Sequence, residues 1–98
     1  MATALAQLAA AQDKNDDHVF LLASQPDSGI INYIELEEKD DDPLNVRANG
    51  NWRPLITNLT YPTYTAFDFE LGYLYICDCD HIAQYKLTFV DDTVEATE

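Results

Sequence analysis

Basic residues are scarce in this 98-residue sequence: five Lys and Arg stand against 18 Asp and Glu, which gives a formal net charge of -13. A surface of this charge repels nucleic-acid phosphates and anionic lipids, so direct binding of DNA, RNA or a membrane surface is disfavoured. Three interpretations of the acidity stay open: plain solubility, a surface for a cation or a basic protein, and mimicry of a nucleic-acid backbone by carboxylates.

Glycines, cysteines and long apolar runs are also few. The chain has three glycines and two cysteines, and it contains neither a Gly-rich phosphate loop nor a nucleophile elbow. No apolar run approaches the ~20 residues of a membrane helix. We therefore expect no enzyme activity, no cofactor and no membrane span, while two cysteines leave the redox compartment undecided.

The most informative stretch is residues 62–89, which holds three runs of β type. Residues 63–70 and 81–89 alternate between two faces, and residues 73–77 form a further strand-like run between them, with a break at Gly72 and an acidic corner at residues 78–80. A period of two is typical of half-buried antiparallel strands. The sequence therefore predicts an all-β fold of antiparallel sheets.

Earlier in the chain, residues 18–24 form a nearly continuous apolar run, which is typical of a strand covered on both faces. A Pro-Asp-Ser-Gly turn follows, and residues 30–36 then predict the returning strand of a hairpin. We interpret residues 37–43 as a solvated charged loop. Residues 44–51 read as irregular, with a turn at Asn49-Gly50. Residues 52–59 predict a strand that Pro54 confines to a sheet edge.

The two ends differ in composition from this middle part. We expect residues 1–17 to form a short helix or a flexible tail, residues 18–90 the β-sheet module, and residues 91–98 an acidic, disordered tail. The end of the Ala-rich segment 1–12 resembles the cleavage site of a signal peptide, but the segment lacks the basic region with which a signal peptide begins. Together with a glycosylation sequon at Asn58, it favours an extracellular or secreted protein, with a cytoplasmic one as the alternative.

Residues 18–36 resemble residues 73–87: each segment is an apolar strand, a corner, and a strand that begins with Ile and carries a Tyr. The comparison aligns Tyr33 with Tyr85 and Phe20 with Tyr75. Two further strands lie between the copies, which gives four strands per period. Four strands in about 40–50 residues are typical of a β-propeller blade, and chance similarity between two hairpins is the alternative.

Particular residues also resemble a family. The Ala-Phe-Asp ending at Asp68, the segment 72–78 and the later Ile82 and Tyr85 resemble a blade of the NHL or YWTD β-propellers, best over residues 66–87. The resemblance implies one to two blades. Because a closed propeller needs at least about four, it implies a fragment of a larger protein or assembly from copies. A small free-standing sheet is the alternative.

One cluster could hold a metal. Cys77, Cys79 and His81 are spaced two residues apart, so on an extended strand their side chains would project to the same side. There they could form part of a zinc site, with His18 as a candidate fourth ligand. The other interpretations are a buried thiol at Cys77 with Cys79 at the corner, or an intermolecular disulfide.

Acidic loops and aromatic anchors together predict a partner-binding surface. We expect a non-catalytic module that binds a protein with a basic surface, or copies of itself. A nucleic-acid-mimic inhibitor and a small metal-binding protein are the alternative functions. The residues expected at the binding surface are Asp40, Asp41, Asp42, Trp52, Tyr75, Asp78 and Asp80.

Overall fold

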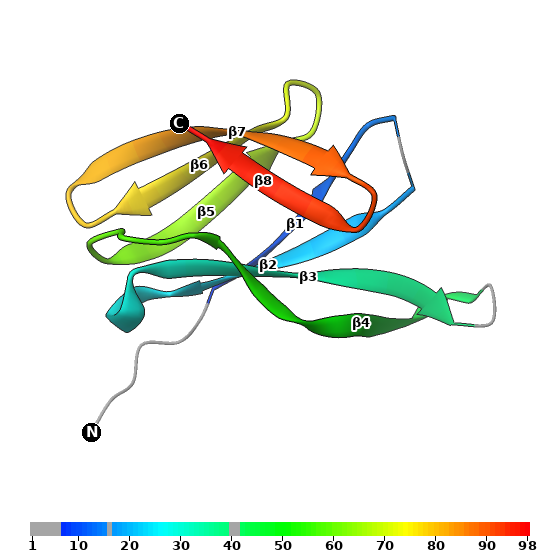
Figure 1. Cartoon of the computed structure of the whole chain (residues 1–98). Helices are drawn as coiled ribbons and strands as arrows, with labels where there is room; N and C mark the ends of the chain where they lie inside the picture. The colour runs from blue at the N-terminus through cyan, green and yellow to red at the C-terminus, as the bar shows by residue number, and fades with distance from the viewer. Residues whose placement is uncertain (1–6, 16, 40–41) are drawn as a thin grey trace.

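The computed structural model describes residues 7–15, 17–39 and 42–98 and shows an all-β protein of two four-stranded antiparallel sheets (Figure 1). Each strand pairs with the next one along the chain. The first sheet contains β1 (Leu8–Gln12), β2 (Val19–Gln25), β3 (Ile30–Lys39) and β4 (Asp42–Ile56). The second contains β5 (Pro62–Asp68), β6 (Tyr73–Asp78), β7 (His81–Val90) and β8 (Thr93–Thr97).

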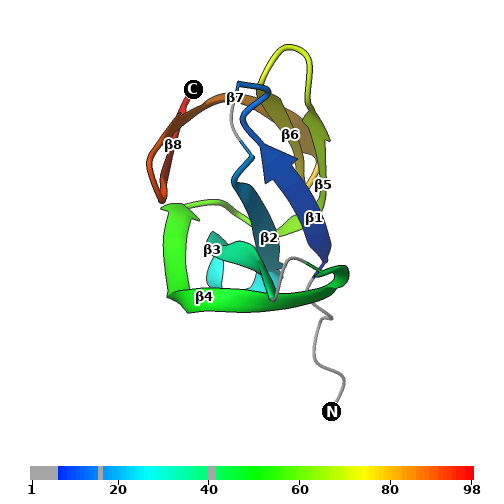
Figure 2. The same cartoon turned by 90° about the vertical axis from the view of Figure 1, so that its right-hand side faces the viewer.

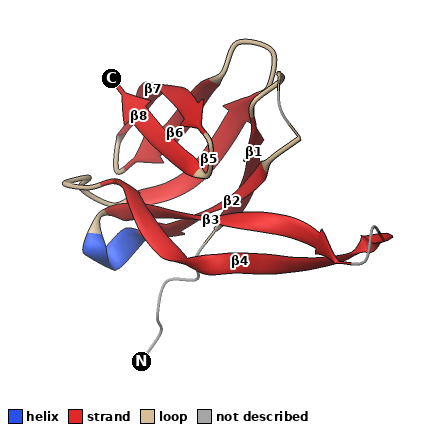
Figure 3. Cartoon of the chain, turned by 45° about the vertical axis from the view of Figure 1, so that its right-hand side comes forward, coloured by secondary structure: helices blue, strands red, loops and turns tan. Residues whose placement is uncertain are grey.

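The two sheets form facing layers, which are clearest when the molecule is seen end-on (Figure 2). They contact each other mainly where β5 lies against β1 and β2 and where β8 lies against β4. The one helical element among the described residues is η1 (Pro26–Ser28), a single turn between β2 and β3 (Figure 3). No helix in this part of the chain is long and apolar enough to cross a membrane.

A single hydrophobic core fills the space between the sheets. Phe20, Leu22, Leu74 and Ile76 have no exposed surface, and they come from β2 and β6, one strand of each sheet. The remaining buried members are contributed by five strands: Ala11 of β1, Ile31 and Tyr33 of β3, Ile56 of β4, Leu87 of β7 and Val94 of β8. Because every second residue of a strand points to the same face, the period-two pattern of the sequence supplies this core directly.

The predicted strands of the middle part are confirmed. Residues 18–24, 30–36, 63–70, 73–77 and 81–89 all lie in or overlap strands, with ends that differ by a few residues. Pro54 lies on β4, and β4 is an edge strand of the first sheet, as its proline predicted.

The expected N-terminal helix is wrong where the structure describes it, because Leu8–Gln12 forms strand β1. Pairing with β2 provides the backbone hydrogen bonds, and Ala11 is small enough to enter the core at 2% exposure. Tertiary pairing thus outweighs the helix preference of an Ala-rich segment. Residues 1–6 of the expected helix or tail lie outside the described residues.

The expected disorder of residues 91–98 is also wrong, because Thr93–Thr97 forms strand β8. A two-residue turn with Asp91 at φ 55 reverses the chain, and β8 pairs with β7. Val94 is 4% exposed in the core. The acidic residues turn the chain or face solvent, so they do not prevent the two apolar positions of this segment from packing.

The charged segment after residue 36 is largely strand as well. Glu37 pairs with Arg47 and Leu36 with Ala48, so β3 and β4 continue as a long hairpin where we expected a loop and an irregular segment. The expected turn at Asn49-Gly50 is a register shift inside β4, where Gly50 has φ 88. A bulge uses the conformational freedom of glycine in the same way as a turn does.

Candidate functional site

The expected binding residues do not gather into one surface. Trp52 lies on edge strand β4 and is 46% exposed, whereas Tyr75 is half-buried on the outward face of β6. Asp80 is exposed in the β6–β7 turn. Asp42 begins β4, and Asp40 and Asp41 lie outside the described residues.

Asp78 is buried, at 3% exposure, although we expected it to bind a partner. Its Oδ1 accepts a hydrogen bond from the Tyr61 N–H at 2.7 Å, and its Oδ2 accepts one from the Thr60 N–H at 3.1 Å. Both oxygens therefore hold the connection between the two sheets. The carboxylate of Asp78 serves the fold and is not available to a partner.

The candidate zinc ligands are not brought together. Cys77 lies on the outward face of β6 opposite Tyr64 and Ile82, whereas Cys79 occupies the turn with φ 60. The turn redirects the chain, so the same-side geometry of an extended strand does not form. Within the part of the chain that the structure describes, no group of three His, Cys, Asp or Glu residues is arranged to hold a metal ion.

The His81 ring lies near carboxylates rather than near the thiols. Its Nε2 is 3.8 Å from Oδ2 of Asp78, and its Nδ1 is 3.5 Å from Oδ1 of Asp80. Cys77 and Cys79 form no disulfide with each other. Asn58 is exposed in the β4–β5 connection; its glycosylation and a secreted location stay predictions.

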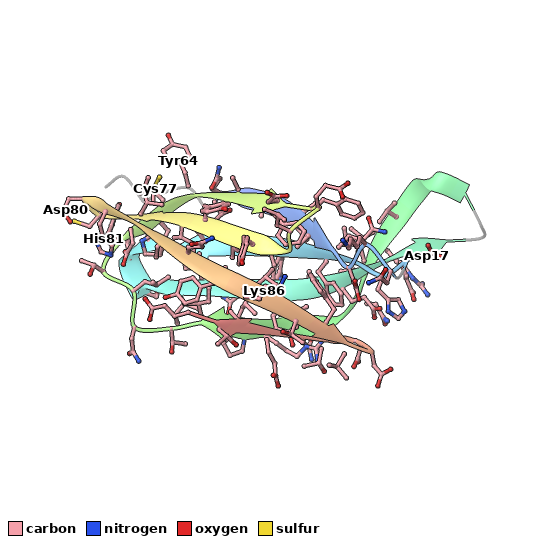
Figure 4. The ribbon with its side chains drawn as sticks, turned by 90° about the horizontal axis from the view of Figure 1, so that it is seen from above. Asp17, Tyr64, Cys77, Asp80, His81 and Lys86 are labelled. Carbon is pink, nitrogen blue, oxygen red and sulfur yellow. The ribbon has the colours of Figure 1, made fainter. Side chains whose placement is uncertain are left out.

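A different group of acidic residues surrounds an open pocket of about 980 Å³. It lies where the β1–β2 connection, the β3–β4 hairpin and the β7–β8 turn approach one another. In Figure 4, Asp17 marks this end of the molecule, and Asp80 and His81 lie at the opposite end. The acidic residues that line the pocket are Asp17, Glu35, Glu37, Asp91 and Asp92.

The alternation of β3 explains how carboxylates come to face the inside of a sandwich. Ile31 and Tyr33 point into the core, and the next inward positions are Glu35 and Glu37. The apolar core therefore ends at Tyr33, and the same face of the same strand continues as an acidic wall. The pocket is the polar end of the space between the sheets.

Glu35 is the most enclosed carboxylate of this group, at 7% exposure. Its Oε1 accepts a hydrogen bond from the Asn49 side chain at 2.8 Å, and its Oε2 lies 3.7 Å from Nε2 of His18. A buried charge interacts more strongly with an incoming cation than an exposed charge does, because less water screens it. Glu35 is thus the strongest candidate for contact with a ligand.

The two arginines near the pocket neutralise it only in part. Arg47 forms an ion pair with Glu37 at 2.7 Å. Arg53 donates to the backbone carbonyl of Asp92 and lies 4.7 Å from the centre of the Tyr33 ring. One of the five carboxylates is therefore paired with an arginine side chain, and the pocket keeps a negative charge.

Two lysines are held at the β5–β6 turn. Lys14 donates to the carbonyl oxygen of Glu70 at 3.3 Å, and Lys86 donates to that of Leu71. Lys86 also lies 5.1 Å from the centre of the Tyr73 ring. Their amines thus fasten a turn and do not enter the lining of the acidic pocket.

The sequence contained a signal for this pocket that the charged-loop interpretation hid. The alternation of the expected strand 30–36 places Glu35 on the same face as Ile31 and Tyr33. If this alternation is continued into the segment that we interpreted as a loop, Glu37 falls on that face as well. What the sequence could not show is which turns approach that face. Asp17 reaches it through the pairing of β2 with β3, and Asp91 and Asp92 reach it only through the stacking of the two sheets.

No protein-family model matches the sequence, and neither a curated protein nor a solved structure is significantly similar to the chain. The pocket is therefore interpreted from its own geometry and charge.

Proposed function

We propose that this chain is a non-catalytic module that binds a basic segment of a partner protein in the acidic pocket. The observation that carries the proposal is the set of five carboxylates around one pocket of about 980 Å³, with Glu35 nearly buried among them. The volume is at the upper end of the roughly 300–1,000 Å³ of ligand sites. It suits a short peptide segment better than a single ion.

Arginine is the side chain that fits this pocket best. A guanidinium donates in a planar fork that matches a carboxylate, and it loses less hydration energy on entry than an ammonium does. The walls also include Val19, Leu36 and Val46.

The charge of the whole chain supports the same partner. A net charge of -13 attracts basic proteins over distance and raises the rate of encounter at low salt. The pocket then provides the specific contacts. A nucleic-acid mimic presents an extended row of negative charges, whereas the described acidic residues of the pocket gather at one end of the molecule. This arrangement favours binding of a compact basic segment over mimicry of a nucleic-acid backbone.

The resemblance to propeller blades is part of this proposal. Each sheet is a four-stranded meander in simple chain order, which is how a propeller blade is built. The acidic pocket lies where several of the connections between these strands approach one another.

The direct test is a calorimetric titration of the protein with a short peptide that carries two arginines. We expect binding that weakens as salt is raised. Glu35→Gln keeps an acceptor for Asn49 but removes the buried charge, and it should weaken binding at least tenfold, because a hydrogen bond to a charged group contributes about 1.5–3 kcal/mol.

Asp80→Asn is the matched control, because it removes the same charge at the opposite end of the molecule. It should change the affinity less than twofold. Equal losses for the two variants would show that only overall charge attracts the peptide. A peptide in which glutamine replaces both arginines should not bind. The proposal fails if it binds as well as the basic peptide does.

A further inference from the structure

His18 lies in the wall of the acidic pocket, next to its most enclosed carboxylate. Its Nε2 is 3.7 Å from Oε2 of Glu35, a distance within the range of an ion pair but too long for a direct hydrogen bond. The two residues come from neighbouring strands, because β2 begins directly after His18 and its Phe20 pairs with Glu35 on β3. The pairing of β2 with β3 therefore places the imidazole beside the carboxylate.

The two carboxylate oxygens of Glu35 have different surroundings. Oε1 accepts a hydrogen bond from the Asn49 side chain at 2.8 Å, whereas Oε2 lies on the side of His18. The side chain of Glu35 is 9% exposed and that of His18 is 47% exposed. Water thus reaches the ring and can exchange a proton with it, while the carboxylate lies where charges are less screened. A positive charge on the ring therefore acts strongly on Oε2.

No lysine or arginine is among the described residues that line the pocket. The two arginines nearby are held by other groups, Arg47 by the Glu37 carboxylate and Arg53 by the backbone carbonyl of Asp92. The charged groups that line the pocket together with His18 are all acidic, and they are Asp17 beside it, Glu35 and Glu37 of β3, and Asp91 and Asp92 of the β7–β8 turn. When its ring is protonated, His18 is therefore the cation of this lining.

We infer that His18 makes ligand binding in the acidic pocket pH-dependent: as an imidazolium it occupies Oε2 of Glu35 and competes there with the basic segment of a partner. The inference rests on the proposed function and adds a regulation to it. Histidine is the side chain that ordinarily changes its charge between pH 5 and 8, whereas aspartate and glutamate stay ionised over most of that range. An arginine that arrives when the ring is charged must displace it and enters a less negative pocket.

The competition between ring and ligand sets the direction of the pH effect. A basic segment binds most tightly when the imidazole is neutral, and its affinity falls as the pH is lowered and the ring gains its proton. By linkage, a bound basic segment must favour the neutral ring by the same factor. The coupling can therefore be measured either on the ligand or on the histidine.

A calorimetric titration with an N-acetylated peptide that carries two arginines, at pH 7.5 and at pH 5.5 and at constant ionic strength, tests this inference. For the natural chain we expect the affinity to be about fivefold weaker at pH 5.5, which corresponds to the loss of one partly exposed ion pair. His18→Gln has a neutral side chain at both pH values, so its two affinities should agree within twofold. His81→Gln is the matched control, because the chain has two histidines and His81 lies at the opposite end of the molecule (Figure 4). It should keep the pH dependence of the natural chain.

Equal affinities of the natural chain at the two pH values would overturn the inference and leave the proposed function standing. The inference also fails if His81→Gln rather than His18→Gln removes the pH dependence. If the peptide binds at neither pH, the proposed function fails, and the histidine ring signals in nuclear magnetic resonance spectra from pH 5 to 8 test the pairing without a ligand. Glu35→Gln should move the titration midpoint of the His18 ring and leave that of His81 in place. An unmoved His18 midpoint would mean that the ring and Glu35 do not interact.

Discussion

The carboxylate of Asp78 accepts a hydrogen bond from the backbone N–H of Tyr61 at 2.7 Å, across the junction of the two sheets. Tyr61 in turn accepts one at its carbonyl oxygen from the N–H of Cys79 at 3.1 Å. The chain that leaves the first sheet is thereby fixed to the end of β6 in the second. The residue that we expected to bind a partner instead sets how the two halves join.

Replacing Asp78 by alanine should therefore destabilise the protein. The substitution leaves the N–H groups of Thr60 and Tyr61 without their charged acceptor, and we expect a loss of roughly 3 kcal/mol in the free energy of unfolding. Denaturant titration followed by circular dichroism measures it. Asp80→Ala, in the same turn but exposed, should change stability by less than about 0.5 kcal/mol. Similar losses for both variants would contradict the anchoring role.

Gly29 and Gly50 provide a second matched pair. Both have positive φ, but a Cβ at Gly29 would lie 2.2 Å from the carbonyl oxygen of Leu59, whereas one at Gly50 would meet nothing within 4 Å. Gly50→Ala should cost roughly 1–2 kcal/mol through backbone strain alone. Gly29→Ala should cost roughly 3 kcal/mol or more, because the Leu59 backbone must move. Equal losses in thermal melts would mean that this close approach is absent.

The shared core predicts that both sheets unfold together. Leu74 is fully buried on β6 and belongs to the same cluster as Phe20 and Leu22 of β2. Leu74→Ala should lower stability by about 2–5 kcal/mol and should speed amide exchange in β2 as well as in β6. If exchange rises in the second sheet alone, the sheets are separate folding units.

Alkaline pH should destabilise the protein through Tyr85. Burial first, and then the carboxylates of Glu98 and Asp78, raise the pKa of Tyr85 above its usual value of 10.0. Because its folded pKa is the higher one, its contribution to stability is fully present below pH 10 and is lost as pH rises through the folded pKa. Melting temperatures from pH 8 to 11.5 should therefore fall less for Tyr85→Phe than for the natural chain. Parallel curves would contradict this.

Hydrophobic patterning together with turn signals predicted six of the eight strands, β4 only in part, because each of these strands has one face in the core. It failed at both ends of the chain for a physical reason. β1 and β8 contribute short side chains such as Ala11 and Val94, and a segment with so little apolar surface is stabilised by pairing with its neighbour. A sequence does not display that pairing.

The candidate site was predicted less well. Acidity directed attention to carboxylates in turns, and it gave equal weight to Asp78, which is buried, and to Asp80, which is exposed. The pocket depends on the pairing of β2 with β3, which brings Asp17 near Glu35, and on the stacking of one sheet on the other, which brings Asp91. Contacts between residues this far apart in the sequence come from tertiary structure alone.

The most direct test of the proposed function is a nuclear magnetic resonance titration of the labelled protein with the two-arginine peptide. We expect saturable shifts concentrated at the pocket, on Asp17, Glu35, Glu37 and Asp92, that disappear in Glu35→Gln. Shifts that are strongest at Asp80, or that are spread over all acidic residues without saturation, would contradict a basic-segment site at this pocket.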